Sequence, residues 1–293
     1  MVPVGEANLS VASSAVLYGL SVYTVLPIVR TASGFSAFRL PEHFKRLSDS
    51  AKIIGLDMPS HITFENFTHY LIQTVAANEP KENVFARATI HVSELVPGTR
   101  SRGLKTLLSI FLYEAMLILS ADGVRLKTSA WRRVPDYAIP SRAKVNGAYV
   151  NSVLAKQDAL DSGYDDCIFL DAAGHVCELS AANIFLVRDG ILITPNASSD
   201  VLEGITRRTV LDIASELEIP YVERSVDLTE LYIADEVFAS GTSASIASVA
   251  EIDKRRIMMA PGPITMQLRD RYVRILRGED VQSQALLTPL RQG

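Results

Sequence analysis

The chain changes character near residue 123, and this change limits the folds that it can adopt. Before it, segments with helical periodicity accompany one long alternating strand; after it, short strand-like runs follow one another with tight turns between them. The run "DDCIFLDAAGHVCEL" predicts a hairpin that turns at Ala172–Gly174, and "NIFLVRDGILIT" predicts another that turns at Asp189–Gly190. We therefore expect an α+β chain in two parts, with domains over residues 1–122 and 123–293.

The first part carries the clearer periodicities. Apolar residues fall on one face of two predicted helices, 40–56 and 64–75, and Pro41 suits the first turn of the former. The run 84–92 alternates instead, as a strand does. Its apolar face comprises Val84, Ala86, Ala88, Ile90 and Val92, and its other face comprises Phe85, Arg87, Thr89 and His91. The second face is too mixed for a core, so we expect it to meet solvent or a pocket.

Two more helices are predicted in the second part. They cover residues 205–217 and 264–277, and Gly278 ends the latter. Between them, Asp227 and Glu230 have the spacing of a capping box, and a strand with a tight turn follows.

Composition argues against several classes of function. The 293 residues are 48% hydrophobic and 21% charged, which supports a sizeable core, and the net charge of −4 gives no general attraction to nucleic acid. The two cysteines form no CxxC, and the N-terminus lacks the pattern of a secretory signal. The apolar run "LKTLLSIFLYEAMLILS" contains Lys105 and Glu114 and is short for a bilayer. We expect a soluble, cytoplasmic protein without nucleic-acid or membrane partners.

Lys144, in "SRAKVNGAYVNSVLAK", offers a specific chemistry. The five histidines form no HExxH or zinc pattern, and the sequence has no GxSxG, P-loop or GxGxxG. A lysine with small neighbours can form a Schiff base with a carbonyl. Pyridoxal phosphate chemistry also needs a carboxylate at the pyridine nitrogen and a phosphate site with helix N-terminal N–H groups and an arginine. Glu178, Gly204 and Arg46 supply these types, although each alone is more often structural.

Together these residues resemble the class IV, or fold type IV, aminotransferases, and among them the branched-chain amino acid aminotransferases. That family's signature runs from a glutamate through Ser, Asn and Phe to a Thr and a Leu-x-Gly-Ile-Thr-Arg stretch. The matching residues are Glu178, Ser180, Asn183, Ile184, Phe185, Thr194, Leu202, Gly204, Ile205, Thr206 and Arg207. The lysine segment, "RLSDSAKIIGL" and "LYIADEVFASGT" are also similar, so the resemblance covers roughly residues 14–280.

The resemblance implies a fold like that of D-amino acid aminotransferase, with a small N-terminal α/β domain and a larger C-terminal domain around a β-barrel-like core. It implies that Lys144 carries pyridoxal 5′-phosphate and shuttles protons, that Glu178 meets the pyridine nitrogen and that Tyr149 meets the ring hydroxyl. The other implied cofactor-binding residues are Leu202 on the ring and Arg46, Gly204, Ile205, Thr206, Gly241 and Thr242 around the phosphate. A homodimer, with each site completed by a loop of the partner, is implied as well.

The substrate side departs from the family pattern. "YGLSVYTVLPI" keeps Tyr18, but Tyr23, Thr24, Val25 and Pro27 stand where the family has Phe, Glu, Gly and Arg. The strand keeps Arg87, whereas Phe85 lacks the family's tyrosine hydroxyl, and "GTSAS" places Ser243 in the later turn. The substrate-binding residues that we predict are Tyr18, Phe85, Arg87 and Ser243. We expect activity with L-leucine, L-isoleucine or L-valine, and a reduced preference for glutamate because Pro27 replaces an arginine.

Three interpretations remain open. The first is a branched-chain transaminase acting on amino acids and 2-oxo acids. The second is another class IV enzyme: a D-amino acid aminotransferase, an (R)-amine transaminase or an aminodeoxychorismate lyase. The third is a non-catalytic binding protein on the same scaffold. Asn146–Gly147 favours the first over the second, and the joint presence of Lys144, Glu178 and Arg46 argues against the third.

Overall fold

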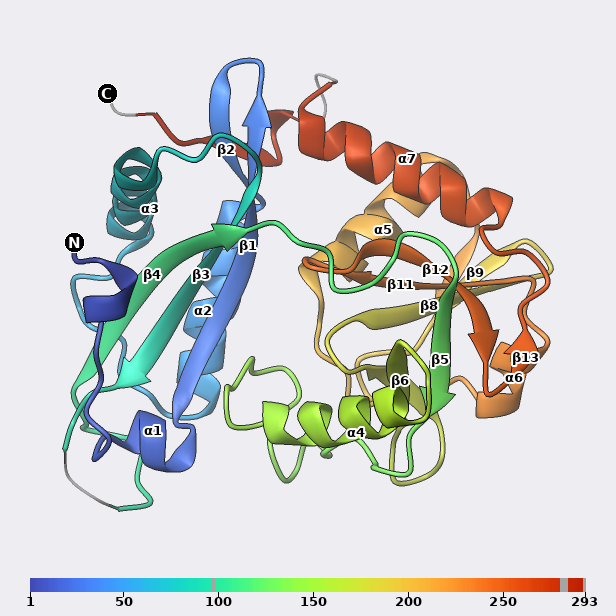
Figure 1. The fold of residues 1–293 in the computed structure, drawn as a ribbon, viewed down its shortest axis with the longest axis horizontal. Helices are drawn as coiled ribbons and strands as arrows, with labels where there is room; N and C mark the ends of the chain where they lie inside the picture. The colour runs from blue at the N-terminus through green and yellow to red at the C-terminus, as the bar shows by residue number, and fades with distance from the viewer. Residues whose placement is uncertain (96–97, 280–283, 292–293) are drawn as a thin grey trace. The chain divides into compact units, whose positions relative to one another are not determined.

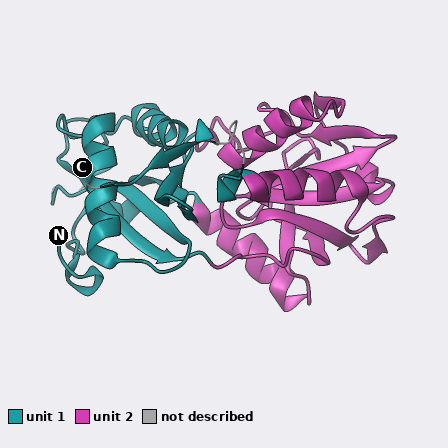
Figure 2. Cartoon of the chain, turned by 90° about the horizontal axis from the view of Figure 1, so that it is seen from above, with its two compact units in different colours: residues 1–115, 143–148, 275–293 teal, residues 116–142, 149–274 magenta. Residues whose placement is uncertain are grey.

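The chain divides into two compact units by its internal contacts. The computed structural model describes residues 1–95, 98–279 and 284–291. Unit 1 comprises residues 1–115, 143–148 and 275–293, and unit 2 comprises residues 116–142 and 149–274, as coloured in Figure 2. The domain boundary after residue 122 stays a prediction about folding domains. The compact units do not follow this boundary, because residues 143–148 and 275–293 belong to unit 1.

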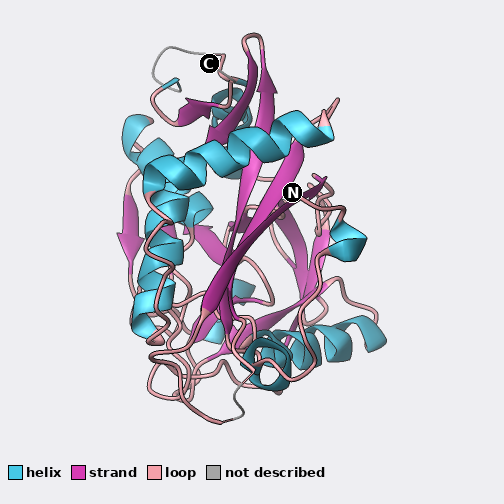
Figure 3. Cartoon of the chain, turned by 90° about the vertical axis from the view of Figure 1, so that its left-hand side faces the viewer, coloured by secondary structure: helices cyan, strands magenta, loops and turns pink. Residues whose placement is uncertain are grey.

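Unit 1 is built on a five-stranded antiparallel sheet in the order β14-β2-β1-β3-β4. The strands are β1 (Ser21–Thr31), β2 (Gly34–Phe38), β3 (Val84–Val92), β4 (Thr106–Glu114) and β14 (Leu287–Pro289). The helices are η1 (Val4–Glu6), α1 (Ser14–Tyr18), α2 (Leu40–Ile53) and α3 (Phe64–Asn78). Figure 1 shows α2 and α3 beside this sheet, and Figure 3 distinguishes its strands from the helices by colour. The two helices and the strand predicted in this part of the sequence are confirmed.

The two faces of β3 have the different roles that its alternation predicts. Ala86, Ala88, Ile90 and Val92 are fully buried in a core with apolar side chains of α2 and α3. The intervening residues therefore lie on the opposite face of the sheet. Register places Arg87 beside Val25 and Thr89 beside Tyr23 of β1, so the mixed face continues onto the neighbouring strand.

The lysine segment packs on β1. An antiparallel bridge joins Val22 to Val145, and the Tyr23 N–H donates to the Lys144 carbonyl at 3.0 Å. Gly19 has a φ of +64°, and a Cβ added to it would lie 2.7 Å from the Cα of Gly147. Only glycine permits this backbone approach, because a side chain would be both strained and in collision. The contact explains why residues 143–148 belong to unit 1.

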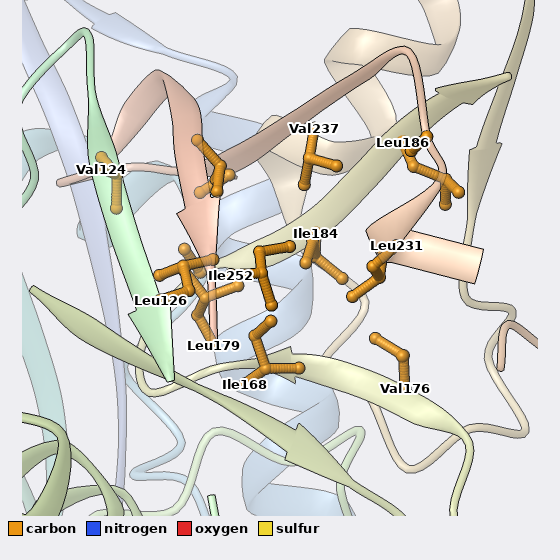
Figure 4. Packing of buried hydrophobic residues seen from close by; sticks show 14 of the residues in the cluster. Val124, Leu126, Ile168, Val176, Leu179, Ile184, Leu186, Leu231, Val237 and Ile252 are labelled. Atoms are coloured by element: carbon orange, nitrogen blue, oxygen red, sulfur yellow. The ribbon is translucent and has the colours of Figure 1, made fainter. Parts of the chain in front are cut away.

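Unit 2 contains a closed barrel of six strands in the order β8-β11-β12-β5-β6-β7, which closes because β7 also pairs with β8. The barrel strands are β5 (Val124–Thr128), β6 (Asp166–Leu170), β7 (Val176–Leu179), β8 (Asn183–Arg188), β11 (Glu236–Gly241) and β12 (Ser245–Ile252). Branched side chains from all six strands point into its interior (Figure 4). The predicted β-barrel-like core is confirmed. Apolar side chains form the core of this barrel, as expected for a barrel with few strands.

The other elements of unit 2 surround the barrel. They are β9 (Ile191–Thr194), β10 (Tyr221–Glu223), β13 (Arg255–Arg256), α4 (Tyr149–Asp161), α5 (Ile205–Glu216), α6 (Leu228–Tyr232) and α7 (Pro263–Arg277), whose last residues belong to unit 1. Both predicted hairpins are present, and Asp189 and Gly190 have the positive φ values of a tight hairpin turn. None of the helices in the described ranges is long and apolar enough to cross a membrane.

The predicted capping box is wrong in its bonding. α6 does begin directly after Asp227, but the Asp227 side chain makes no capping hydrogen bond to it. Glu230 accepts hydrogen bonds from Arg224 instead, one of them at 3.0 Å from Nη1. A charged partner outside the helix therefore takes the carboxylate that would close the box.

Candidate active site

Lys144 and Arg46 are joined through one serine in unit 1. The Lys144 backbone N–H donates to Ser50 Oγ at 3.0 Å, and the same hydroxyl donates to the Arg46 carbonyl at 2.7 Å. Ser50 is fully buried on α2. The Lys144 Nζ lies 4.9 Å from the centre of the Tyr23 ring. Two residues that the sequence predicted for one site are thus anchored to the same helix.

Thr24 and His43 fix the guanidinium of Arg46. Arg46 Nη2 donates to Thr24 Oγ1 at 3.1 Å, and Thr24 Oγ1 lies 2.8 Å from His43 Nδ1. Arginine can only donate, so the threonine hydroxyl accepts from Arg46, and the same oxygen forms a hydrogen bond with His43 Nδ1. Burial, with the nearby charges of Arg46, Lys144 and Arg39, lowers the pKa of His43 well below its usual value, which is consistent with a neutral ring.

Arg87 lies against Tyr23 from the mixed face of the sheet. Its Cζ is 3.7 Å from the centre of the Tyr23 ring, a cation–π geometry. Its Nη2 donates to Asn146 Oδ1 at 2.5 Å. No carboxylate pairs with Arg87 among the described residues. The idea that this arginine only serves a surface ion pair is therefore not supported.

Glu178, the last residue but one of β7 in unit 2, has a buried carboxylate that accepts hydrogen bonds. Its side chain accepts from Arg133 Nε at 2.9 Å, from Asn183 Nδ2 at 3.2 Å and from the Leu202 N–H at 3.1 Å. The residue is only 7% exposed. Burial, with the neighbouring charge of Glu178, raises the pKa of the Cys177 thiol, so Cys177 is an inert core residue rather than a nucleophile.

The N-terminus of α5 presents unsatisfied donors beside that carboxylate. Ile205 and Thr206 are 7% and 3% exposed, and their backbone N–H groups have no hydrogen-bond partner within the described ranges. The N-cap residue Gly204 has no side chain to cap the helix, and the first turn contains no acidic residue. Buried N–H groups at a helix N-terminus attract anions. Leu202, whose N–H binds Glu178, stands directly before this turn.

The remaining predicted residues lie at various places in their units. Tyr149 is the first residue of α4, and Gly241 ends β11 in register with Ser245, so Thr242 and Ser243 lie in the turn between β11 and β12. Phe85 is buried with its ring 5.7 Å from that of Tyr113, whereas Tyr18 is exposed at the end of α1.

Sequence reasoning missed the residues that hold the predicted ones in place. Arg133, His43 and Asn146 each bind a predicted side chain or its partner, yet none was assigned a role. Asn146 could have been noticed, because it is a polar residue between the lysine and Gly147. No local pattern marks Arg133, which lies 45 residues from Glu178 in sequence.

Each unit, taken by itself, carries its own set of groups with a defined chemistry. Unit 1 has the Lys144 amine near the Tyr23 ring and two guanidinium groups, which donate to the neutral side chains of Thr24 and Asn146. Unit 2 has a buried carboxylate beside anion-binding N–H groups. An amine that can attack a carbonyl, a carboxylate that can hold a protonated ring nitrogen and a phosphate site are the requirements of pyridoxal phosphate chemistry. The residues therefore fit that cofactor.

Comparison with known proteins agrees with this chemistry. The family model for amino-transferase class IV matches residues 21–252. A probable branched-chain-amino-acid aminotransferase of Synechocystis is 38% identical over 271 residues, covering 92% of this chain and 87% of the relative. A similarly named protein of Aquifex aeolicus is 36% identical and covers 99% and 94%.

Solved structures match the whole chain. The branched-chain aminotransferase of Thermoproteus uzoniensis with norvaline superposes with a TM-score of 0.95 at 39% identity, covering 99% of this chain and 96% of that one. The branched-chain amino acid aminotransferase of Escherichia coli gives a TM-score of 0.92 at 31% identity, covering 99% of this chain and 97% of that one. The Thermobaculum terrenum enzyme, solved with pyridoxal phosphate as its holo form, gives 0.89 at 35% identity, with 99% and 96% coverage.

Proposed function

The chain belongs to the class IV aminotransferases, and we propose how its residues carry out branched-chain transamination, the transfer of an amino group between an aliphatic L-amino acid and a 2-oxo acid. Pyridoxal 5′-phosphate is the cofactor that we propose. When bound, it supplies a protonated ring that withdraws electrons from the substrate Cα. The fold type IV architecture that the sequence predicted is that of its structural neighbours.

One observation carries the cofactor assignment. Leu202 donates its N–H to the Glu178 carboxylate and stands just before the donors of Ile205 and Thr206. A single short segment therefore borders both a carboxylate suited to a pyridine nitrogen and N–H groups suited to a phosphate. The donors of Arg133, Asn183 and Leu202 stabilise the Glu178 carboxylate as an anion. This buried anion would favour a proton on the adjacent ring nitrogen.

The other proposed cofactor contacts follow from residue chemistry. Arg46, Ile205, Thr206 and Thr242 would hold the phosphate, and the glycines Gly204 and Gly241 would leave room for it. Leu202 would pack on the ring, and Tyr149 would donate to its hydroxyl group.

Lys144 would bind the cofactor covalently and act as the catalytic base. As a free amine it would take a proton from the substrate Cα and return it at the cofactor C4′. The Ser50 and Tyr23 contacts fix the backbone on which this amine is carried. A fixed backbone limits where the amine can reach, which favours transfer between two neighbouring carbon atoms.

Substrate recognition would fall to the mixed face of the unit 1 sheet. The Arg87 guanidinium would bind a substrate carboxylate, together with Ser243, while Phe85 and Val25 would contact an aliphatic side chain. Tyr18 would be a further substrate-binding residue. Pro27 pairs with Phe85 in the sheet and stands where the family pattern has an arginine, so we propose that glutamate is a weaker substrate.

A homodimer is part of the proposal. Val150, Val153 and Leu154 form an apolar stripe along α4 and are 65%, 64% and 41% exposed. Side chains at this spacing share one face of a helix, and exposed apolar faces of this kind mark interfaces. Light scattering at working concentration should report a dimer, and a fully active monomer would refute this part. A cytoplasmic location stays a prediction from the sequence.

Borohydride reduction tests the cofactor site directly. The purified, cofactor-loaded protein should absorb visible light, and reduction should fix the cofactor to the peptide that contains Lys144. Label on Lys127 or Lys156 instead would refute the assignment.

A substrate panel tests the reaction. L- and D-amino acids and simple (R)-amines are each paired with pyruvate and 2-oxoglutarate. L-leucine, L-isoleucine and L-valine should be the preferred donors. Turnover confined to D-alanine, D-glutamate or (R)-amines would refute the proposed substrates and leave the cofactor site standing.

A further inference from the structure

Asn146 bridges two strands of unit 1 through its side-chain amide. Nδ2 donates to Ser21 Oγ at 2.7 Å, and Oδ1 accepts from Arg87 Nη2 at 2.5 Å. Arginine has no acceptor, so the amide must present its oxygen to Arg87, and the orientation of Asn146 is determined. The Asn146 backbone N–H also donates to the Ser21 carbonyl at 2.9 Å. Hydrogen bonds therefore fix both the backbone and the side-chain amide of Asn146.

This contact leaves the charge of Arg87 without a counterion. The guanidinium is half-buried, stacks on Tyr23 and gives a hydrogen bond to a neutral amide, while no acid of the described chain lies within ion-pair distance. A guanidinium has five N–H donors, most of which remain for another acceptor. A half-buried cation with spare donors in a fixed plane suits a carboxylate, which it can bind through two parallel hydrogen bonds.

The geometry also relates this cation to the reactive amine. Arg87 Cζ lies 3.7 Å and Lys144 Nζ 4.9 Å from the centre of the same Tyr23 ring, so the two groups are separated by no more than the sum of these distances. An amino acid carries its amine and its carboxylate on one carbon atom. The two cationic side chains around Tyr23 therefore lie within reach of one small substrate.

We propose that Asn146 is a positioning residue for substrate binding: it fixes the Arg87 guanidinium over Tyr23 and, being neutral, leaves its charge to the substrate carboxylate. This inference rests on the proposed function. An aspartate of the same shape would hold Arg87 equally well but would neutralise it. Asn146→Asp thus separates the role of holding the arginine from the role of leaving it charged.

The experiment uses the cofactor-loaded enzyme and 4-methylvalerate, a branched carboxylate without an amine. Its Kd is measured by titration of the cofactor absorbance. For Asn146→Asp the Kd should rise about tenfold or more, and KM for L-leucine should rise in parallel while kcat changes much less. For Asn146→Ala the rise should be smaller, because the guanidinium is loosened but keeps its charge.

Two controls isolate the charge effect. Asn8→Asp makes the same charge change at an exposed position and should leave the Kd unaltered. The neutral analogue 4-methylvaleramide should bind wild type and Asn146→Asp equally, because it does not need the arginine charge. Unfolding midpoints of all variants show that each is folded.

Either of two results overturns the inference. The first is a 4-methylvalerate Kd for Asn146→Asp within about twofold of wild type, because twofold is well below the smallest charge-assisted loss expected. The second is equal weakening of the carboxylate and the amide, which would indicate a damaged pocket. Failure of the wild type to bind 4-methylvalerate or to transaminate L-leucine would overturn the proposed function itself, and that outcome is distinguishable from both.

Discussion

Gly204→Ala adds a single methyl group, and we expect it to break the hydrogen bond that Asn183 donates to the Glu178 carboxylate. Gly204 has φ −66° and ψ 136°, values that alanine adopts without strain. A Cβ built there would nevertheless lie 2.1 Å from Asn183 Oδ1 and 3.3 Å from the Cβ of Arg207. Asn183 is buried in β8, paired with Glu178 on one side and Ser240 on the other, so its backbone cannot yield. Its side chain must rotate instead.

The cost follows from the hydrogen bonds that Asn183 would lose. Its Nδ2 donates to Glu178 Oε2 at 3.2 Å and to the Leu202 carbonyl at 2.9 Å. A hydrogen bond to a charged group contributes roughly 1.5–3 kcal/mol and a neutral one about 1 kcal/mol. Replacing glycine by alanine also restricts the unfolded chain, which returns about 0.4–1 kcal/mol. We expect a net loss of about 1–4 kcal/mol in the free energy of unfolding.

Urea unfolding followed by fluorescence measures this loss as a lower midpoint at an unchanged m-value. Gly5→Ala is the matched control, because nothing lies within 4 Å of a Cβ at that position. In an Asn183→Ala background the atom at 2.1 Å is gone and only the Arg207 contact at 3.3 Å remains, so Gly204→Ala should cost much less. A Gly204→Ala variant within about 0.5 kcal/mol of wild type, or one equally harmful in both backgrounds, would refute the reasoning.

Three further predictions concern other residues. Glu178→Gln should retain the cofactor by absorbance but lose most transamination, since a neutral amide cannot hold a protonated pyridine; near-normal turnover would remove the carboxylate from the mechanism. His43 stays neutral in the fold, because its pKa is lowered by burial, so below about pH 6.5 the unfolded chain binds a proton that the folded chain does not. The free energy of unfolding should therefore decrease as the pH is lowered, by up to ~1.4 kcal/mol per pH unit. The variant His43→Gln should lack this contribution in urea titrations between about pH 7 and 5, and identical slopes would contradict it. Glu236→Ala should lower the free energy of unfolding by roughly 2–4 kcal/mol, because its buried carboxylate accepts from the N–H groups of Ile264 and Thr265 at the start of α7; an unchanged urea midpoint would show that the cap is dispensable.

Local patterns in the sequence determined several elements of both units. The alternation over 84–92 specified β3 and its two faces, because a strand presents successive side chains to opposite sides. Asp189 and Gly190 specified a hairpin, because few residue pairs accept the backbone of that turn. The spacing from Glu178 to Thr206 identified the family, and through it the residues proposed to bind the cofactor.

The tertiary structure alone decided which side chains support those residues. Arg133 meets Glu178, Asn146 meets Arg87 and Thr24 joins His43 to Arg46, and each contact spans 19 to 59 residues of sequence. Such contacts leave no period in the sequence, because they depend on strand register and barrel closure rather than on local propensity. The return of the lysine segment to β1 is of the same kind, since it requires Gly19 and Gly147 to meet across a distance that only the folded chain brings to contact. The sequence thus names the groups that we propose to react, and the packing of the folded chain determines which neighbours hold them.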